Sequence, residues 1–142
     1  MNRELLIVDD EEEIRDTLDR YFGRFGYEVE LAANGKEALR VLECRVMRVV
    51  ISDISMPVMD GIDLLTQIRT HYPMTRVIMI TEYVTLDRVL ACMRNHADTC
   101  IMKPLDDLNE LNCAVERAFE HLEHWERILL DLQGMKSAAV MA

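Results

Sequence analysis

The sequence has no apolar run that approaches the roughly 20 residues needed to cross a membrane. Basic residues are in the minority, 16 against 26 acidic ones, and the formal net charge is −10. Such an acidic balance argues against a general nucleic-acid-binding surface. The first apolar segment is followed at once by acidic residues, which excludes a signal-peptide pattern. We therefore expect a cytoplasmic protein that contacts no membrane and binds no nucleic acid directly.

The cysteines lack the paired spacing that is typical of a structural metal site, and internal repeats and low-complexity tracts are also missing. The four cysteines are Cys44, Cys92, Cys100 and Cys113. Reduced thiols are the expected state in a cytosolic protein. What is present is a chain of 142 residues, half of them hydrophobic and 30% charged. That length and composition predict one globular domain with a proper core.

Short apolar runs alternate with helical patterns along the chain. Four continuous runs predict strands buried on both faces of a parallel sheet, and they lie at 5–8, 49–51, 77–80 and 100–102. The segment 27–31 alternates in polarity, as a half-exposed edge strand does. Apolar residues recur at helical spacing at 14–25, 38–42, 62–68 and 86–93, and a fifth helix is expected from about Leu105 to Leu132. This alternation predicts an α/β doubly wound fold.

Polar residues stand where the predicted strands end. Asp9 and Asp10 follow the first strand, Asp53 ends the third, Thr81 the fourth and Lys103 the fifth. In sheets of this class the ligand site lies outside the carboxyl ends of the strands. We therefore expect three carboxylates, one hydroxyl and one ammonium group to converge at one edge of the sheet.

The chemistry of this set limits its function. Two like charges about 4 Å apart repel by about 4 kcal/mol at an effective dielectric constant of about 20. Three carboxylates beside one lysine stay net negative, and a hard cation such as Mg²⁺ would relieve the repulsion. A carboxylate next to such a cation can act as a nucleophile and form an acyl phosphate. Capping of helices and strand ends explains any one of these acids, but not the whole set at successive strand ends.

The sequence resembles the receiver domains of two-component response regulators over about residues 4–120. The resemblance rests on the segments 7–11 (IVDDE) and 53–61 (DISMPVMDG), on Thr81 and on Lys103-Pro104. It implies a flavodoxin-like (βα)5 three-layer sandwich, with a parallel five-stranded sheet of order 2-1-3-4-5 and an extended C-terminal helix. In a phosphorelay, such a domain is a signalling switch, and its only catalysis is its own phosphoryl transfer and hydrolysis.

The resemblance also implies roles for the matching residues. Asp53 accepts a phosphoryl group from a sensor histidine kinase, a phosphotransfer protein or a small phosphodonor. Asp10, Asp53 and the backbone carbonyl of Ser55 bind Mg²⁺, and Asp9 acts through a metal-bound water.

Lys103 is expected to contact the phosphoryl group, with a cis bond to Pro104, which X–Pro bonds tolerate. Thr81 is expected to move toward a phosphoryl oxygen and to repack the face of the fourth helix, fifth strand and fifth helix.

Two alternatives stay open. A phosphatase with the same intermediate is disfavoured, because Ser55 stands where a second acid would. A pseudo-receiver that binds partners without phosphorylation is disfavoured by the intact acid set.

Three positions depart from the pattern of the family. Glu82 follows the switch threonine, where a small residue is usual, and either points to solvent or adds an anion to the site. Cys100 replaces the usual aromatic residue, which leaves Tyr83 or backbone motion to couple the switch; a buried inert thiol is favoured over a redox role. His96 stands in place of the usual glycine, which matters if its φ is positive.

The last helix is longer than a receiver domain needs. Apolar residues repeat at spacings of three and four over four heptads, at 108, 111, 115, 118, 122, 125, 129 and 132. We expect a receiver domain at 1–120, a coiled-coil-like helical extension at 121–133 and a flexible tail at 134–142. The extension either pairs in a homodimer, packs on a downstream domain or folds back. His121 and His124 could share a metal ion, but a solvated face is favoured.

Overall fold

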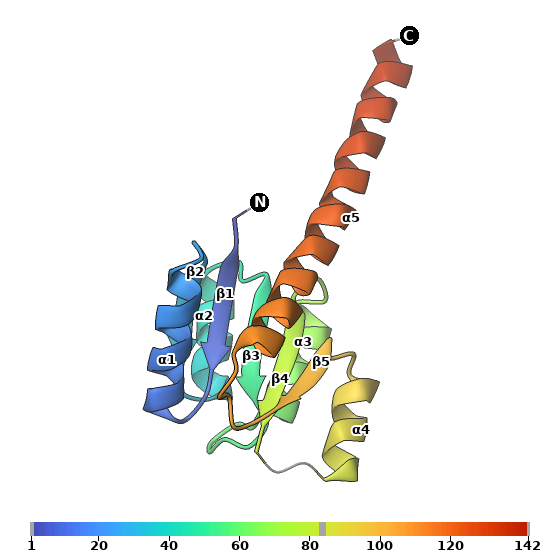
Figure 1. The fold of residues 1–142 in the computed structure, drawn as a ribbon. Helices are drawn as coiled ribbons and strands as arrows, with labels where there is room; N and C mark the ends of the chain where they lie inside the picture. The colour runs from blue at the N-terminus through green and yellow to red at the C-terminus, as the bar shows by residue number, and fades with distance from the viewer. Residues whose placement is uncertain (1, 83–84, 142) are drawn as a thin grey trace.

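The computed structural model describes residues 2–82 and 85–141, with side chains described up to Met135. Within these residues a central sheet is flanked by helices (Figure 1). The strands are β1 (Glu4–Val8), β2 (Glu28–Ala32), β3 (Val49–Asp53), β4 (Arg76–Thr81) and β5 (Thr99–Met102). The helices are α1 (Glu12–Gly23), α2 (Gly35–Cys44), α3 (Gly61–His71), α4 (Leu86–Arg94) and α5 (Asn109–Met141).

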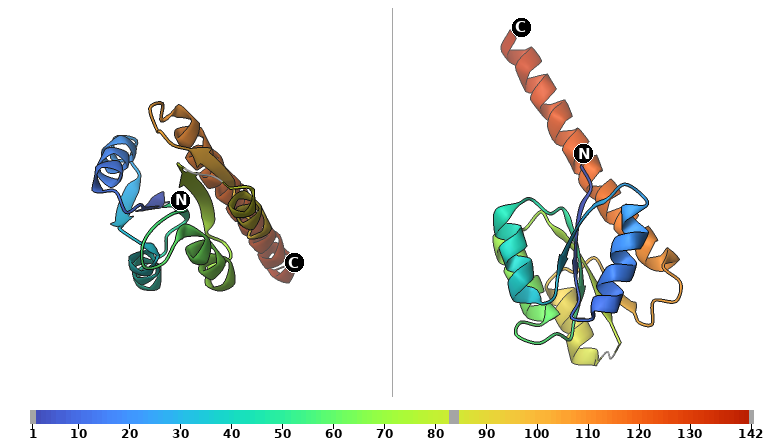
Figure 2. Two further views of the ribbon diagram at one scale, coloured as in Figure 1. Left: turned by 90° about the horizontal axis from the view of Figure 1, so that it is seen from below. Right: turned by 90° about the vertical axis from the view of Figure 1, so that its left-hand side faces the viewer.

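All strand pairs are parallel and the strand order is β2-β1-β3-β4-β5, which confirms the expected topology. Helices α1 and α5 cover one face of the sheet, and α2, α3 and α4 cover the other (Figure 2). Each face has its own hydrophobic cluster, one centred on Phe22 and Phe119 and the other on Leu64 and Leu65. The molecule is therefore the three-layer α/β sandwich that the alternation of elements predicts.

The two outer strands are less buried than the three inner ones. β2 is half-exposed, as its alternating sequence predicts. For β5 the expectation of burial on both faces is wrong, since Thr99 is exposed and Met102 is 53% exposed. An outer strand has a neighbour on one side only, so a run of apolar letters does not by itself guarantee burial.

Helix α4 ends in a left-handed turn that is usually built on glycine. The N–H of Ala97 donates to the Cys92 carbonyl (3.0 Å), and the N–H of His96 donates to the Met93 carbonyl (3.1 Å). These two bonds define a Schellman motif, whose C′ residue adopts positive φ. Here that residue is His96, with φ 59°. The non-glycine residue therefore keeps the turn of the family, at a cost of roughly 1–2 kcal/mol.

Helix α5 begins later and ends later than the sequence pattern predicts. The Asp107 carboxylate accepts a hydrogen bond from the N–H of Asn109 (2.9 Å), and this contact marks the first turn. At the other end the backbone stays helical through Gly134 to Met141, where we expected an irregular tail. A glycine inside a helix costs only about 1 kcal/mol relative to alanine, which the flanking helix formers offset.

The second half of α5 leaves the domain as one continuous helix (Figure 1). The alternative in which the extension folds back on its own domain is therefore wrong. His121 and His124 are both exposed, as expected for a solvated face. The indole N–H of Trp125 donates to Nε2 of His121 (3.1 Å). In the described part of the chain, no helix has both the length and the apolarity for a membrane crossing.

Candidate functional site

The carboxyl ends of the parallel strands bring the predicted polar residues together. Asp9 follows β1, Asp53 ends β3, Thr81 ends β4 and Lys103 follows β5. All four are buried, with Asp9 0% and Asp53 5% exposed, whereas Asp10 is exposed. Burial of three charged side chains is costly unless they pair with one another. The cluster is therefore held by its internal ion pairs.

Lys103 is the centre of these ion pairs. Its Nζ lies 3.0 Å from Oδ2 of Asp9, 3.3 Å from Oδ2 of Asp53 and 3.6 Å from Oε1 of Glu11. The backbone N–H of Lys103 donates to the Thr81 carbonyl (2.8 Å), which fixes the end of β5 beside β4. The Lys103-Pro104 bond is cis, as expected. Glu11 was missed as a site residue, although its place directly after two acids was a usable signal.

Three carboxylates at this edge offer a cation site. Oxygen atoms of Asp9, Asp10 and Asp53 all lie within 4.8 Å of one another. Oδ1 of Asp9 accepts the N–H of Glu11 (2.9 Å), while for the fully buried Oδ2 no well-aligned hydrogen bond is found among the described residues. Hard oxygen ligands from two or three carboxylates, with room for water on the exposed Asp10 side, suit Mg²⁺. The donor set present thus fits this ion.

The charge balance of the cluster shifts its proton affinities. Burial, and then the neighbouring Asp9 charge, raise the pKa of Asp53 to about 6 despite the opposing effect of Lys103. Burial also raises the pKa of Asp9. Burial alone would lower the pKa of Lys103, but hydrogen bonds and charges from the two aspartates raise it overall. The lysine stays charged, and the unbalanced negative charge makes the ionised form of Asp53 less favourable than usual.

The β3–α3 loop shapes the floor of the site. The N–H of Met59 donates to the Pro57 carbonyl (2.9 Å) across Val58, whose φ is 72°. A γ-turn with positive φ is rare and strained, above all for a β-branched residue. At the loop's end a Cβ on Gly61 would collide with the backbone carbonyl of Asp53. Glycine at this position therefore lets α3 start directly against the Asp53 backbone.

Ser55 lies in the same loop, with an exposed side chain whose Oγ accepts a hydrogen bond from Nη1 of Arg88 (3.4 Å). This contact joins the loop to α4 on the far side of the site. The metal-ligand role of the Ser55 backbone carbonyl stays a prediction.

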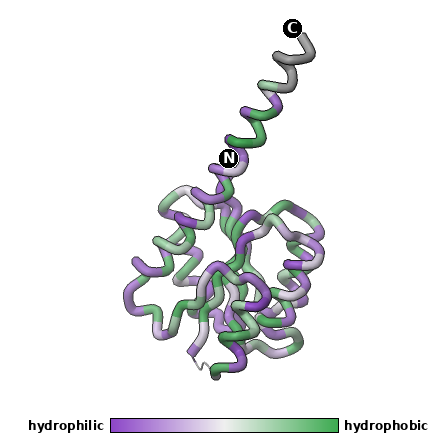
Figure 3. Tube along the Cα trace, turned by 90° about the vertical axis from the view of Figure 1, so that its right-hand side faces the viewer, coloured by the Kyte–Doolittle hydropathy of each residue, from purple (hydrophilic) through white to green (hydrophobic). Residues whose placement is uncertain are grey.

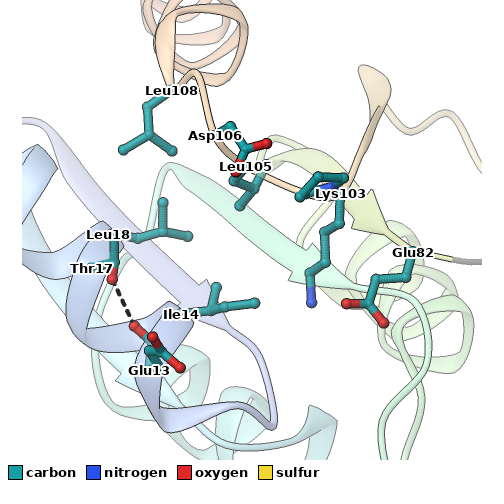
Figure 4. Close-up of a pocket in the computed structure, with 10 residues that line it drawn as sticks. Glu13, Ile14, Thr17, Leu18, Glu82, Lys103, Leu105, Asp106 and Leu108 are labelled. Carbon is teal, nitrogen blue, oxygen red and sulfur yellow. Dashed lines mark hydrogen bonds between the residues drawn. The ribbon is translucent and has the colours of Figure 1, made fainter.

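A cleft of about 310 Å³ opens beside Lys103, between α1 and the β5–α5 loop. Ile14, Leu105 and Leu108 give it an apolar wall, and Glu82 stands at its edge with its carboxylate directed toward the Lys103 ammonium (Figure 4). The Glu82 side chain is exposed, so it lies at the mouth of the site and not inside the buried cluster.

The other departures from the family pattern are also placed. Cys100 is half-buried against the cluster on the α2–α3–α4 face, and burial raises the pKa of its thiol. This environment favours the inert thiol over the redox role. Tyr83, the alternative aromatic coupler, lies outside the described residues.

A parallel (βα)5 sandwich with buried acids and a lysine at the carboxyl edge of its sheet defines a doubly wound α/β protein with an acidic site whose donors fit a cation. Residues 5–116 match the family model described as response regulator receiver domain. The chain belongs to this family.

Two curated relatives and one solved structure illustrate the likeness. Regulatory protein AtoC of Escherichia coli is 40% identical over 116 residues, covering 82% of this chain and 25% of that protein. Regulator of RpoS of the same organism is 32% identical over 141 residues, covering 95% and 42%. The structure of the response regulator protein TrrA from Thermotoga maritima, in complex with Mg²⁺-BeF, aligns with a TM-score of 0.74 at 31% identity, covering 82% and 98%.

The chain spans 25% of the length of AtoC and 42% of the length of Regulator of RpoS. The alignment with Regulator of RpoS covers nearly all of this chain, whereas that with AtoC covers a length similar to the family match.

Replacement of Asp53 by Asn is expected to stabilise the metal-free protein at alkaline pH. The folded pKa of Asp53, about 6, is above the ordinary value of 3.8, so the ionised carboxylate costs stability above pH 6. The cost fades as pH falls toward the ordinary value, because both states are then protonated. A shift of this size corresponds to at most about 3 kcal/mol. Urea unfolding in EDTA at several pH values measures the difference in the free energy of unfolding between the parent protein and Asp53→Asn.

Asp16→Asn, at an exposed position of α1, is the matched control and should leave the unfolding free energy unchanged within about 0.5 kcal/mol. A stability gain for Asp53→Asn that is equally large at low and high pH would contradict the electrostatic explanation.

Proposed function

We propose that Asp53 is the phosphoacceptor of a Mg²⁺-dependent signalling switch, with a sensor histidine kinase or a phosphotransfer protein as donor. The observation that carries this proposal is the ion-paired triad of Asp9, Lys103 and Asp53 at the carboxyl edge of the sheet. A buried carboxylate held beside one ammonium and two other acids is poor as a structural element but well placed as a nucleophile.

The chemistry is a phosphoryl transfer between two nucleophiles. An Asp53 oxygen attacks phosphorus while the bond from phosphorus to the donor's imidazole nitrogen breaks, and the imidazole keeps the electron pair. The product is a mixed anhydride, an acyl phosphate on Asp53. Nζ of Lys103 lies 3.3 Å from Oδ2 of Asp53. It is therefore near enough to contact a phosphoryl oxygen and to stabilise its negative charge.

Mg²⁺ is the implied cofactor, and Asp10, Asp53 and the Ser55 carbonyl would hold it, with Asp9 acting through a bound water. When bound, the ion offsets the carboxylate charges and the charge on the incoming phosphoryl oxygens. Support comes from the acid cluster itself and from TrrA, whose structure is a complex with Mg²⁺-BeF. Asp53 must be ionised to act, and a neighbouring cation favours that form.

The cleft between α1 and the β5–α5 loop is the proposed approach of the donor. It reaches Lys103 from the surface, and its wall is apolar where a donor helix or loop would pack.

Thr81 ends β4 beside the cluster, and its backbone carbonyl accepts a hydrogen bond from the backbone N–H of Lys103. A shift of Thr81 toward a phosphoryl oxygen would move this strand end and the adjoining face of α4, β5 and α5. That face is the proposed signalling surface, with Leu86, Met93 and Met102 exposed on it.

The extension of α5 is the proposed route of output. The last two of the four heptads extend past the domain, and Trp125, Leu129 and Leu132 are each about half-exposed. Apolar residues continue along the described part of the extension (Figure 3). A single exposed helix with an apolar stripe needs a partner. We assign it to a coiled-coil homodimer, and a downstream domain remains the alternative occupant.

Incubation with Mg²⁺ and acetyl phosphate is expected to give one phosphoryl adduct in intact-protein mass spectrometry. Asp53→Asn should abolish the adduct, because it removes the nucleophilic oxygen, and EDTA should suppress it in the parent protein. Asp16→Asn is again the control that keeps the adduct. An unmodified parent protein, or an adduct that survives in Asp53→Asn, would favour the pseudo-receiver.

Glu82→Ala is expected to speed phosphorylation by acetyl phosphate several-fold. The carboxylate at the mouth of the cleft repels an anionic donor, and an exposed charge contributes a modest electrostatic barrier that salt screens. Glu82→Gln separates charge from size and should be nearly as fast, while the advantage of both variants should shrink at high ionic strength. Equal rates for parent and variants would discard a role for Glu82.

A further inference from the structure

Helix α4 is held to the domain by very little apolar burial, and it lies at the periphery of the sandwich (Figure 1). Cys92 is the one buried residue among its nine, whereas α3 buries four of its eleven. Leu86 is 74% and Met93 66% exposed, so two large apolar side chains of α4 face solvent. Elements with few buried contacts belong to the least stable parts of a fold and are the ones that move in conformational switches.

The two ends of α4 are held in different ways. Its carboxyl end closes in the Schellman turn at His96, and the backbone continues directly into a hydrogen bond from the N–H of Asp98 to the Val77 carbonyl of β4 (2.8 Å). At its amino end the side chain of Thr85 caps the helix by accepting the N–H of Arg88 (3.3 Å). That cap lies within the first turn of α4 itself and does not attach the helix to the rest of the domain.

Arg88 provides the attachment of the amino end. Its Nη1 donates to Oγ of Ser55 in the β3–α3 loop (3.4 Å), and in the described part of the chain this is the hydrogen bond that joins the first turn of α4 to another element. A guanidinium has five N–H donors. Among the described residues, the Arg88 guanidinium makes this single long bond to a neutral hydroxyl and no ion pair. Most of its capacity to bind an anion is therefore unused.

Ser55 holds Arg88 close to the phosphorylation site. It follows Asp53 by two residues, so the two Cα atoms lie no more than about 7 Å apart. The loop is fixed before Ser55, where the N–H of Ile54 donates to the Ile80 carbonyl of β4 (3.1 Å). It is fixed after Ser55, where the Met59 carbonyl accepts the N–H of Gly35 (3.2 Å). Arg88 is thus a cation held at a set place beside a group that is expected to gain negative charge.

A phosphoryl group on Asp53 would offer Arg88 a much stronger partner than Ser55. It carries about two negative charges at neutral pH and three acceptor oxygens. A guanidinium binds such oxygens through two parallel N–H bonds, whereas it binds a hydroxyl through one. Lys103 cannot meet this demand alone, because its ammonium already lies within 3.3 Å of both Asp9 and Asp53. A second cation at the site therefore has a defined task.

We propose that Arg88 is the positioning residue that couples phosphorylation of Asp53 to α4: it binds Ser55 in the unmodified domain and a phosphoryl oxygen in the phosphorylated one. The change of partner draws the first turn of α4 toward the site, while the carboxyl end of the helix stays in place. The inference rests on the proposed function and names the residue that carries the signal to the proposed signalling surface. It also accounts for Cys100, because a charged side chain from α4 replaces an aromatic coupler on β5.

Hydrogen exchange of the complete chain tests this coupling, with Mg²⁺ and acetyl phosphate present during a short labelling pulse. The intact mass of the same samples gives the fraction of protein that carries the adduct, and each exchange rate is corrected for that fraction. In the parent protein, the amides of α4 should exchange about five-fold or more slowly after phosphorylation, because a bond to a phosphoryl group replaces a long bond to a hydroxyl. The amides of α3 serve as the internal reference for an intact fold.

Substitutions of Arg88 and Ser55 separate the two partners. Arg88→Gln removes the charge and should reduce the slowing to less than about two-fold, whereas Arg88→Lys keeps the charge without the planar fork and should retain part of the slowing. Ser55→Ala removes only the hydroxyl, so α4 should exchange faster before phosphorylation and still slow afterwards. Arg94→Gln, at an exposed position in the last turn of α4, is the matched control and should respond as the parent protein does.

Full slowing in Arg88→Gln would overturn the proposal, and so would an unchanged α4 in a parent protein that carries the adduct. Loss of the slowing in Ser55→Ala as well as in Arg88→Gln would show that Arg88 stays on Ser55, which contradicts the change of partner. A parent protein without any adduct would reject the proposed function itself and this inference with it. The intact mass reveals that case before any exchange rate is compared.

Discussion

The pairing of Lys103 with two buried aspartates is the interaction on which the site depends. Lys103 comes from the end of β5, Asp9 from β1 and Asp53 from β3, so the ammonium joins three strand ends across the sheet. One cation cannot balance the acids around it, and the residual charge raises the pKa of Asp53 to about 6. The protein thus keeps a buried carboxylate in an unfavourable electrostatic state, which a divalent cation would relieve under the proposed function. Under the proposed function, the stability given up at this edge is what prepares Asp53 to react.

The parallel sheet separates the chemistry from the proposed assembly. Carboxyl ends carry the acids and the strained Val58 turn, whereas amino ends lie beside the departing helix α5, whose Trp125 and Leu129 line a groove there with Val46 and Met74. Helix α5 covers the sheet between the two poles, with Val115 and Phe119 fully buried. A change at Thr81 that moves β4 or β5 therefore reaches α5 through direct packing, without any need for a longer path.

The site was predictable because strand-end residues in a parallel sheet must meet at one edge. That rule placed Asp9, Asp53, Thr81 and Lys103 together, and the strand order followed from the resemblance. Features that depend on neighbours were not predictable. The exposure of β5 depends on its lying at the sheet's edge, and the Lys103 contact with Glu11 depends on the turn before α1. Helix α5 extends past its predicted end at Leu132, because the backbone stays helical to Met141 where a frayed terminus was expected.

Calorimetry of Mg²⁺ binding tests most directly whether Asp53 is a carboxylate whose ionised form is disfavoured until a cation binds. Titrations near pH 6 in two buffers with different ionisation enthalpies give the number of protons released. Because Mg²⁺ requires the ionised carboxylate, we expect release of a substantial fraction of one proton, falling toward zero near pH 8 and absent in Asp53→Asn. Mg²⁺ binding without proton release near pH 6, or with the same release in Asp53→Asn, would contradict this expectation.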